Sequence, residues 1–475
     1  MDLHDGPWTE ARFRAYAADL ASALGHADRV RPFADYCVGL LSAEGRKSVE
    51  PLAAVTAPQR TAAQHQSLLH LVAQAPWSDQ AVLGRVRERV VPSITRDEPI
   101  QAWIIDDTGF PKKGHHSVGV ARQYCGQLGK QDNCQVAVSL SVATHQGSLP
   151  VAYRLYLPKD WADDPVRRTV AGVPEDICFQ TKPEIALQQM RQALAAGVPP
   201  GVVLGDPAYG NDSNFRAGIT DLGLSYALGI MPSTTVWRPG EMPLPPAPRS
   251  GRGRPAKRLR RDGTHRPVSV KTLAMELPAD AWQPIAWRDG SNTPLASRFA
   301  RLRVRPAHDD ARRGEPADEE WLLIEWPEDE TEPDHYWLST LSADISFEHL
   351  VDRTKMRWRI ERDYLELKQE VGLGHYEGRG WRGFHHHASL CIAAYGFLVS
   401  EKETIPPSGP SGAWHGPRSA VPDGYRPRGS AAAFTAPYAE LDRNAAYPPR
   451  SRARSRPATM PMLRTPHTAV VGQAD

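Results

Sequence analysis

The sequence has 475 residues, which is long enough for a buried core and suggests two or three domains. Its formal net charge of +2 hides a basic block at 249–266 and an acidic block at 319–334, so the net charge indicates no class of partner. The cysteines, an odd number of five, show no C-x-x-C spacing, which excludes a disulfide framework and favours reduced thiols.

The ends and the hydropathy of the chain bear on its location. The first residues, MDLHDGPWTE, lack an apolar signal core, and no stretch reaches about 18 uninterrupted apolar residues. We therefore expect a soluble cytoplasmic protein without a membrane partner.

Residues 1–95 predict a helical N-terminal domain. Segments such as ARFRAYAADLASALG and TAAQHQSLLHLVAQ place apolar residues three and four positions apart. Two roles stay equally open, namely DNA-end binding or dimerisation on the one hand and a cap packed on the next domain on the other.

Residues 96–231 change to a pattern of strands and helices. QAWIID, NCQVAVSLSVAT and PVAYRLYL predict three consecutive strands, and KPEIALQQMRQALAAG predicts a helix. The strand GVVLGD, a second helix through NDSNFRAGITDLG and the strand LSYALGIM follow. This order predicts an α/β fold with a mixed sheet flanked by helices.

Residues 232–339 interrupt this pattern. A Pro- and Arg-rich connection leads to two predicted strands, RFARLRVRP and EEWLLIEW, so we expect a β-rich insertion. Residues 340–403 return to the α/β domain with a single helix over 347–371 and an apolar helix over ASLCIAAYGFLVSEKE. Residues 404–475 are rich in Pro, Arg, Ala and Ser and predict a disordered tail.

Carboxylates stand at the ends of two predicted strands. IIDDTGFPKKG carries Asp106 and Asp107, and VVLGDPAYG carries Asp206. Ligands usually bind at such strand ends, although an Asp that caps a turn or a helix is the commoner case for each motif alone. Successive strand residues face opposite sides, so only one of Asp106 and Asp107 can enter a given site, and alternation does not select which.

The predicted helix over 347–371 carries a charged face. Arg357, Glu361 and Lys368 are spaced four and seven apart and therefore align beside an apolar stripe. An ordinary solvated ion-pair face is an equally good interpretation of this helix alone.

Two strand-end carboxylates and one helical carboxylate form the oxygen-ligand set that Mg²⁺ prefers. Two such ions could activate a nucleophile and stabilise the leaving oxygen of an in-line displacement, with Arg357 and Lys368 on the phosphate. The predicted chemistry is phosphoryl transfer on nucleic acid. A glycosidase or esterase with paired carboxylates is disfavoured, because such sites need no Arg-Glu-Lys face.

These residues together resemble the DDE transposases of bacterial insertion sequences, in the group with a β insertion and a Y-R-E-K signature. Arg357, Glu361 and Lys368 fit the signature, whereas Thr354 stands at the Tyr position. The resemblance spans roughly residues 100–400 and includes DDTGFPKKG with the following HSVGVARQYCGQLGK, the DPAYG turn and EGRGWRGFHHHASL.

The resemblance implies a ribonuclease-H-like fold and a set of site residues. It places the first metal aspartate directly before the Thr, which selects Asp107 over Asp106, so the implied catalytic and metal-binding residues are Asp107, Asp206 and Glu361. The implied cofactor is a pair of Mg²⁺ or Mn²⁺ ions. The expected DNA contacts are Arg357, Lys368, Lys112, Lys113 and Arg122.

The resemblance also implies partners and a reaction. Members bind terminal inverted repeats as homodimers, cut them and join the 3′ ends to target DNA, which would place the chain at the nucleoid. The alternative is a catalytically silent or truncated transposase-derived DNA-binding protein, since the tail does not predict a folded terminal helix.

Three further features have a functional and a plainer interpretation. Trp326 or Trp337 could hold a flipped base, but core packing is commoner for such residues. The basic run 249–266 could follow a phosphate backbone or form a solvated loop. Consecutive histidines point in different directions on a helix, so His385, His386 and His387 are not expected to close a zinc site.

Overall fold

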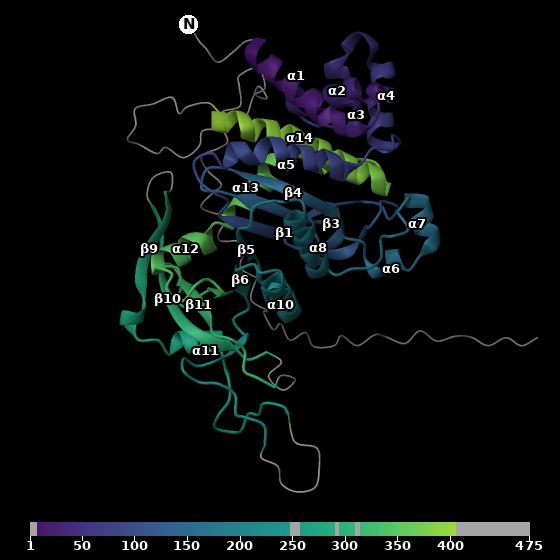
Figure 1. Cartoon of the computed structure of the whole chain (residues 1–475). Helices are drawn as coiled ribbons and strands as arrows, with labels where there is room; N and C mark the ends of the chain where they lie inside the picture. The colour runs from purple at the N-terminus through teal and green to yellow at the C-terminus, as the bar shows by residue number, and fades with distance from the viewer. Residues whose placement is uncertain (1–6, 248–256, 290–293, 309–313, 405–475) are drawn as a thin grey trace, which may run out of the picture. The chain divides into compact units, whose positions relative to one another are not determined.

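The structure of the chain is a computed structural model that describes residues 7–247, 257–289, 294–308 and 314–404 (Figure 1). The predicted tail 404–475, except for Thr404, lies outside the described residues, as does the first part of the basic run 249–266.

The N-terminal part is helical, as predicted. Its helices are α1 (Pro7–Ala21), α2 (Val30–Ser42), α3 (Val49–Thr56), α4 (Thr61–Ala73) and α5 (Asp79–Ile94). They share one core with the last described helix, α14 (Trp381–Thr404). The Phe13 and Phe397 rings, for example, meet edge to face at 5.1 Å between centroids. The apolar spacing that predicted these helices therefore serves packing against α14.

A mixed sheet forms the centre of the fold. Its strands are β1 (Ala102–Pro111), β2 (Ala121–Cys125), β3 (Lys130–Ala143), β4 (Ser148–Leu155), β5 (Val202–Gly205) and β6 (Tyr226–Ile230). β3 pairs antiparallel with β4 and β1, and β5 lies parallel between β1 and β6. The order β4-β3-β1-β5-β6 confirms the predicted ribonuclease-H-like α/β fold.

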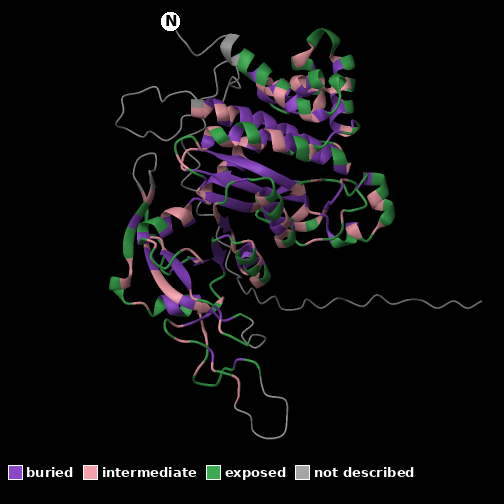
Figure 2. Cartoon of the chain, in the orientation of Figure 1, coloured by how far each residue is buried: buried purple, intermediate pink, exposed green. Residues whose placement is uncertain are grey.

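Helices flank this sheet. The remaining helices of the domain are α6 (Lys159–Ala162), α7 (Pro165–Ala171), α8 (Lys182–Ala195), α9 (Pro207–Gly210), α10 (Ser213–Asp221) and α13 (Trp358–Gln369). α5 and α14 pack side by side on β4 (Figure 1). Ile360 and Tyr364 of α13, with Met356 in the turn before it, share a buried cluster with Ile104 of β1 and Leu204 of β5. Most residues of β1, β3 and β4 are buried between these helices (Figure 2).

The predicted β-rich insertion is present and extends the same sheet. Its elements are β7 (Thr235–Trp237), β8 (Val268–Ser269), α11 (Val270–Met275), β9 (Gln283–Asp289), β10 (Pro294–Pro306), β11 (Glu320–Trp326) and β12 (His335–Ser339). β12 pairs with β11 on one side and with β6 on the other. The strands of the insertion thus continue the central sheet.

The prediction of a single helix over 347–371 is wrong, because this segment forms two helices separated by a turn. α12 (Phe347–Lys355) ends at a turn through Met356 and Arg357 before α13 begins. Phe347, Leu350 and Val351 of α12 pack into the core of the insertion, whereas Ile360 and Tyr364 pack on the central sheet. Two separate cores therefore bend the chain at Arg357.

Within the described ranges, no helix is both long and apolar enough to cross a membrane.

Gly210 allows α9 to approach β6 closely. A Cβ at this position would lie 1.9 Å from the carbonyl oxygen of Gly229. We predict that Gly210→Ala lowers the free energy of unfolding by about 1–3 kcal/mol, the usual cost of overpacking. Urea denaturation checks this, with Gly126→Ala as the control because a Cβ at Gly126 meets nothing within 4 Å. Equal midpoints for the two variants would contradict the close approach.

Candidate active site

Asp206 lies where β5 ends and the chain turns. Its side chain caps α9 by accepting a hydrogen bond from the Ala208 amide at 2.9 Å, and Pro207 occupies the first turn of that short helix. Burial raises the pKa of Asp206, the guanidinium of Arg357 opposes this rise, and the negative charge of Asp107 adds to it. Asp206 is thus a helix cap that also belongs to a group of interacting carboxylates.

Asp106 faces α13. β1 pairs with β3 without a bulge, so Asp106 points to the same side as Ile104, which packs under that helix. Its Oδ2 lies 3.7 Å from Nη1 of Arg357. The pKa of Asp106 is raised to about 7. Burial is the main cause of the rise, the charge of Arg357 opposes it, and the charges of Asp206 and Asp107 add to it.

Asp107 points to the opposite face of β1 and forms an ion pair with Lys182 at the start of α8. Its side chain is 19% exposed, close to the 13% of Asp106, so exposure does not distinguish the two residues. The negative charge of Asp107 contributes to the raised pKa values of both Asp106 and Asp206. Both β1 aspartates thus interact electrostatically with Asp206, but they point to opposite faces of the strand and have different basic partners.

Arg357 is the shared counter-charge of the cluster. Burial lowers its pKa, but the charges of Asp106, Glu361 and Asp206 outweigh this and raise it above its ordinary value. Its Nη1 is also 3.1 Å from Oε1 of Glu361, whose side chain is 62% exposed. Glu361 is thus connected to the β1 carboxylates through Arg357 and remains open to solvent.

The other predicted basic residues divide into two classes. Lys368 donates to the Gly109 carbonyl at 2.9 Å, and burial lowers its pKa to about 8. Lys112 donates to the Tyr376 carbonyl at 3.0 Å, and burial lowers its pKa as well. Lys113 and Arg122 are exposed to solvent.

Two residues of this region were missed by the sequence interpretation. Tyr364 belongs by its spacing to the apolar stripe of the predicted helix, yet its hydroxyl lies 2.7 Å from Ser139 Oγ and donates to the Asp106 carbonyl at 3.2 Å. Lys182 lies far from Asp107 in the sequence and stands in no motif. Thr354, at the signature's Tyr position, is buried and donates to the Leu350 carbonyl of its own helix.

The features with two interpretations have protein partners in the structure. Trp326 meets Trp282 edge to face and donates to the Glu330 carbonyl, and Trp337 stacks on His335. The three consecutive histidines form hydrogen bonds with different parts of the core. His385 bonds to Trp381 and Leu155, His386 to Val72 and Trp77, and His387 to Tyr36 and Gly372.

The cluster matches a divalent cation in donor chemistry. Asp106, Asp107, Asp206 and Glu361 offer hard oxygen donors. Burial, with a smaller contribution from neighbouring aspartate charges, raises the pKa values of Asp106 and Asp206, and a bound cation would oppose both effects. Among the described residues, no group of three or more His, Cys, Asp or Glu side chains is arranged to hold a metal ion. In this structure Arg357 and Lys182 balance the charge instead.

Comparison with known proteins gives two matches. Residues 19–294 match the pattern of a family described as DDE superfamily endonuclease. This range exceeds half of the chain; it contains Asp107 and Asp206 and ends before α12. The chain is also 31% identical over 194 residues to the "probable transposase for insertion sequence element IS701" of Microchaete diplosiphon. That match covers 41% of this chain and 47% of the relative, so it spans about half of the relative's length.

Tyr364 fastens α13 to β1 and β3. We predict that Tyr364→Phe lowers the free energy of unfolding by about 1 kcal/mol or more, because the buried Ser139 hydroxyl loses this partner. Chemical denaturation measures the change. Tyr124→Phe is the control, since Tyr124 is 52% exposed, and a comparable loss in both variants would refute the fastening role.

Proposed function

The chain belongs to the DDE superfamily of endonucleases, and from this premise we propose that it is a DNA transposase. It cuts phosphodiester bonds at the terminal inverted repeats of an insertion sequence and joins the freed 3′ ends to target DNA. The observation that carries the proposal is the group of partly buried carboxylates formed by Asp106 and Asp107 within β1 and Asp206 just after β5, beside Arg357 and Glu361. The similarity to the IS701 protein supports the choice of reaction.

We propose Asp107, Asp206 and Glu361 as the metal ligands, with Asp107 chosen on the strength of the resemblance, although Asp106 is the β1 aspartate that faces α13, the helix of Glu361. They would hold two Mg²⁺ or Mn²⁺ ions, which when bound would activate the attacking water or 3′-hydroxyl and stabilise the leaving oxygen. The exposure of Glu361 leaves its carboxylate accessible to a DNA phosphate and its ions.

The basic residues are proposed to bind and orient DNA. Arg357 presents a planar guanidinium beside the carboxylates, a group suited to two oxygens of one phosphate. Lys368, held by the Gly109 carbonyl, interacts with the charge of Asp106, whereas Lys112 follows the end of β1 and is held by the Tyr376 carbonyl. Lys113 and Arg122 stand outside it and would contact the flanking backbone. We also propose a homodimer on DNA, on the strength of the resemblance to transposases.

Loss of any proposed metal ligand should abolish cutting. We predict that Asp107→Asn, Asp206→Asn and Glu361→Gln each reduce cleavage of a labelled terminal-repeat duplex about a hundredfold or more in Mg²⁺ or Mn²⁺, because metal ions contribute several kcal/mol of transition-state stabilisation. DNA binding, measured by gel shift, should persist.

Glu366→Gln is the matched control, because Glu366 forms the equivalent i,i+4 pair with Arg362 on the same helix. Asp106→Asn belongs in the same experiment. An inactive Asp106→Asn beside an active Asp107→Asn would move the first ligand to Asp106, and a fully active Glu361→Gln enzyme would refute the site. A wild-type protein that binds the duplex but never cuts it would instead identify a silent copy.

Lys113 and Arg122 should contribute to affinity through charge alone. We predict that Lys113→Gln and Arg122→Gln each weaken DNA binding and reduce the slope of log K against log salt by about one, the value for one lost phosphate contact. Binding titrations at several salt concentrations measure this. Arg14→Gln is the control, since Arg14 is exposed on α1. Unchanged slopes would remove both residues from the DNA interface.

A further inference from the structure

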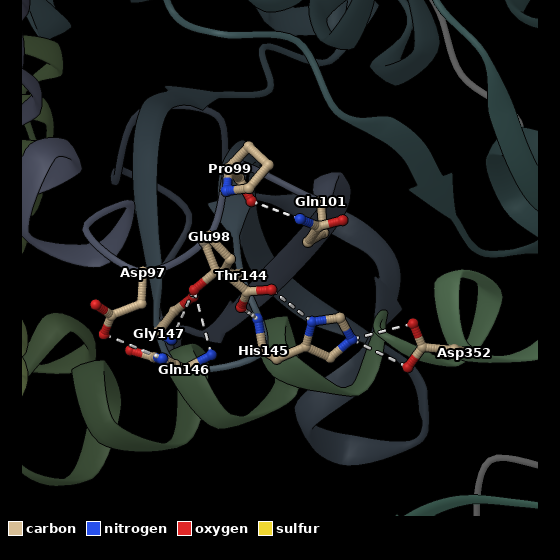
Figure 3. Close-up of polar contacts among 9 residues, drawn as sticks. All are labelled: Asp97, Glu98, Pro99, Gln101, Thr144, His145, Gln146, Gly147 and Asp352. Atoms are coloured by element: carbon tan, nitrogen blue, oxygen red, sulfur yellow. Dashed lines mark hydrogen bonds and ion pairs between the residues drawn. The ribbon is translucent and has the colours of Figure 1, made fainter. Parts of the chain in front are cut away.

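Three segments of the chain meet at His145, outside the carboxylate cluster (Figure 3). Nδ1 of its ring lies 2.9 Å from Oε2 of Glu98, in the segment that enters β1. Nε2 lies 3.0 Å from both oxygens of Asp352 on α12. His145 itself sits in the turn between β3 and β4. The ring thus bridges two carboxylates from elements far apart in the sequence.

The turn that carries His145 holds the ring in this orientation. Thr144 Oγ1 accepts from the amides of Gln146 and Gly147 at 3.2 and 3.1 Å. Glu98 accepts from the backbone amide of His145 as well as facing its ring. A Cβ at Gly147 would lie 3.0 Å from Ile94, so the turn also packs tightly on the end of α5. Contacts within the turn and with Glu98 therefore hold the imidazole without any contribution from α12.

The two ends of the bridge lead to the two halves of the candidate site. Glu98 comes just before β1, which carries Asp106 and Asp107. Asp352 comes just before the turn at Met356 and Arg357. Because the helix is broken there, the position of α12 does not follow from that of α13 and depends on contacts of its own.

We propose that His145 is a positioning residue, which by bridging Glu98 and Asp352 fixes α12 and so holds Arg357 beside the carboxylates. This inference rests on the proposed function only for its effect on DNA cutting. A second contact acts with the bridge, since Lys355 donates to both oxygens of the buried Glu325 at 3.0 Å. That ion pair ties α12 to the insertion, whereas His145 ties it to the central domain.

The bridge is complete only when the imidazole is protonated. A neutral ring has one N–H and can donate to one carboxylate, whereas the imidazolium donates to both. The hydrogen bond to Asp352 raises the pKa of His145, burial opposes the rise, and Glu98 adds to it. Other charged groups around the bridge, on the segment before β1 and on α12, α13 and α14, are Arg96, Asp97, His349, Arg353, Arg359, Lys402 and Glu403.

The sign of the pH effect follows from that shift. A histidine whose pKa is higher in the folded protein stabilises the fold most below its unfolded value, about 6.5. This stabilisation is lost as the pH rises through the folded value. The hold on α12 should therefore weaken on the alkaline side.

Hydrogen–deuterium exchange tests the positioning without any cutting assay. In Asp352→Asn, backbone amides from Leu350 to Ile360 should exchange about five- to tenfold faster than in the wild type at pH 6, after correction for intrinsic rates, as expected for the loss of one hydrogen bond that is partly exposed to solvent. The difference should shrink at pH 9, where the wild-type bridge has lost its second proton. Glu348→Gln on the same helix is the control, because its side chain is exposed. Equal exchange in wild type and Asp352→Asn at pH 6, or the same acceleration in Glu348→Gln, would overturn the proposal.

Cleavage kinetics provide the second readout. Asp352→Asn and His145→Gln should lower the cutting rate about five- to tenfold, and should remove the alkaline decline in rate that the bridge predicts for the wild type. An unchanged cutting rate, or an alkaline decline that persists in both variants, would contradict a positioning role. A wild type that does not cut at all would refute the proposed function, while the exchange experiment would still decide the bridge.

Discussion

The parallel register of β1 and β5 sets Ile104 opposite Leu204 and so brings Asp106 of β1 next to Asp206, two residues further along in each case, while β1 itself continues to Pro111. Burial raises the pKa values of Asp106 and Asp206, and the charges of neighbouring aspartates add to the rise. Such a cluster is tolerable only with opposite charge nearby, and the chain provides it from two directions. Arg357 lies directly before α13 and faces Asp106, and Lys182 at the start of α8 pairs with Asp107. The arrangement of helices on the two faces of the sheet is therefore also an arrangement of counter-charges.

The break between α12 and α13 follows from the way the insertion is attached. Because β12 pairs with β6, the chain returns from the insertion next to the strand from which it left. α12 then completes the core of the insertion, and α13 completes that of the central sheet. Arg357 lies at the meeting point of these two packing units. Its position depends on contacts that both units make with α12, including those of His145 and Lys355.

The sequence predicted the features that local periodicity encodes. Alternation along NCQVAVSLSVAT indicated β3, the apolar run before Asp206 indicated β5, and the spacing of Arg357 and Glu361 indicated a shared face. Alternation also showed that Asp106 and Asp107 point to opposite sides. It could not say which side α13 covers, because that depends on packing between distant elements. The bend at Met356, the pairing of Lys182 with Asp107 and the role of His145 were hidden for the same reason.

The position of β12 has one more consequence, for solubility. All five residues of β6 are buried, and one edge of that strand is covered by β12. A shortened chain that joined β6 directly to α12 would expose an apolar strand edge of the kind that pairs between molecules. The insertion thus protects the central sheet from edge-to-edge aggregation, whatever else it does on DNA.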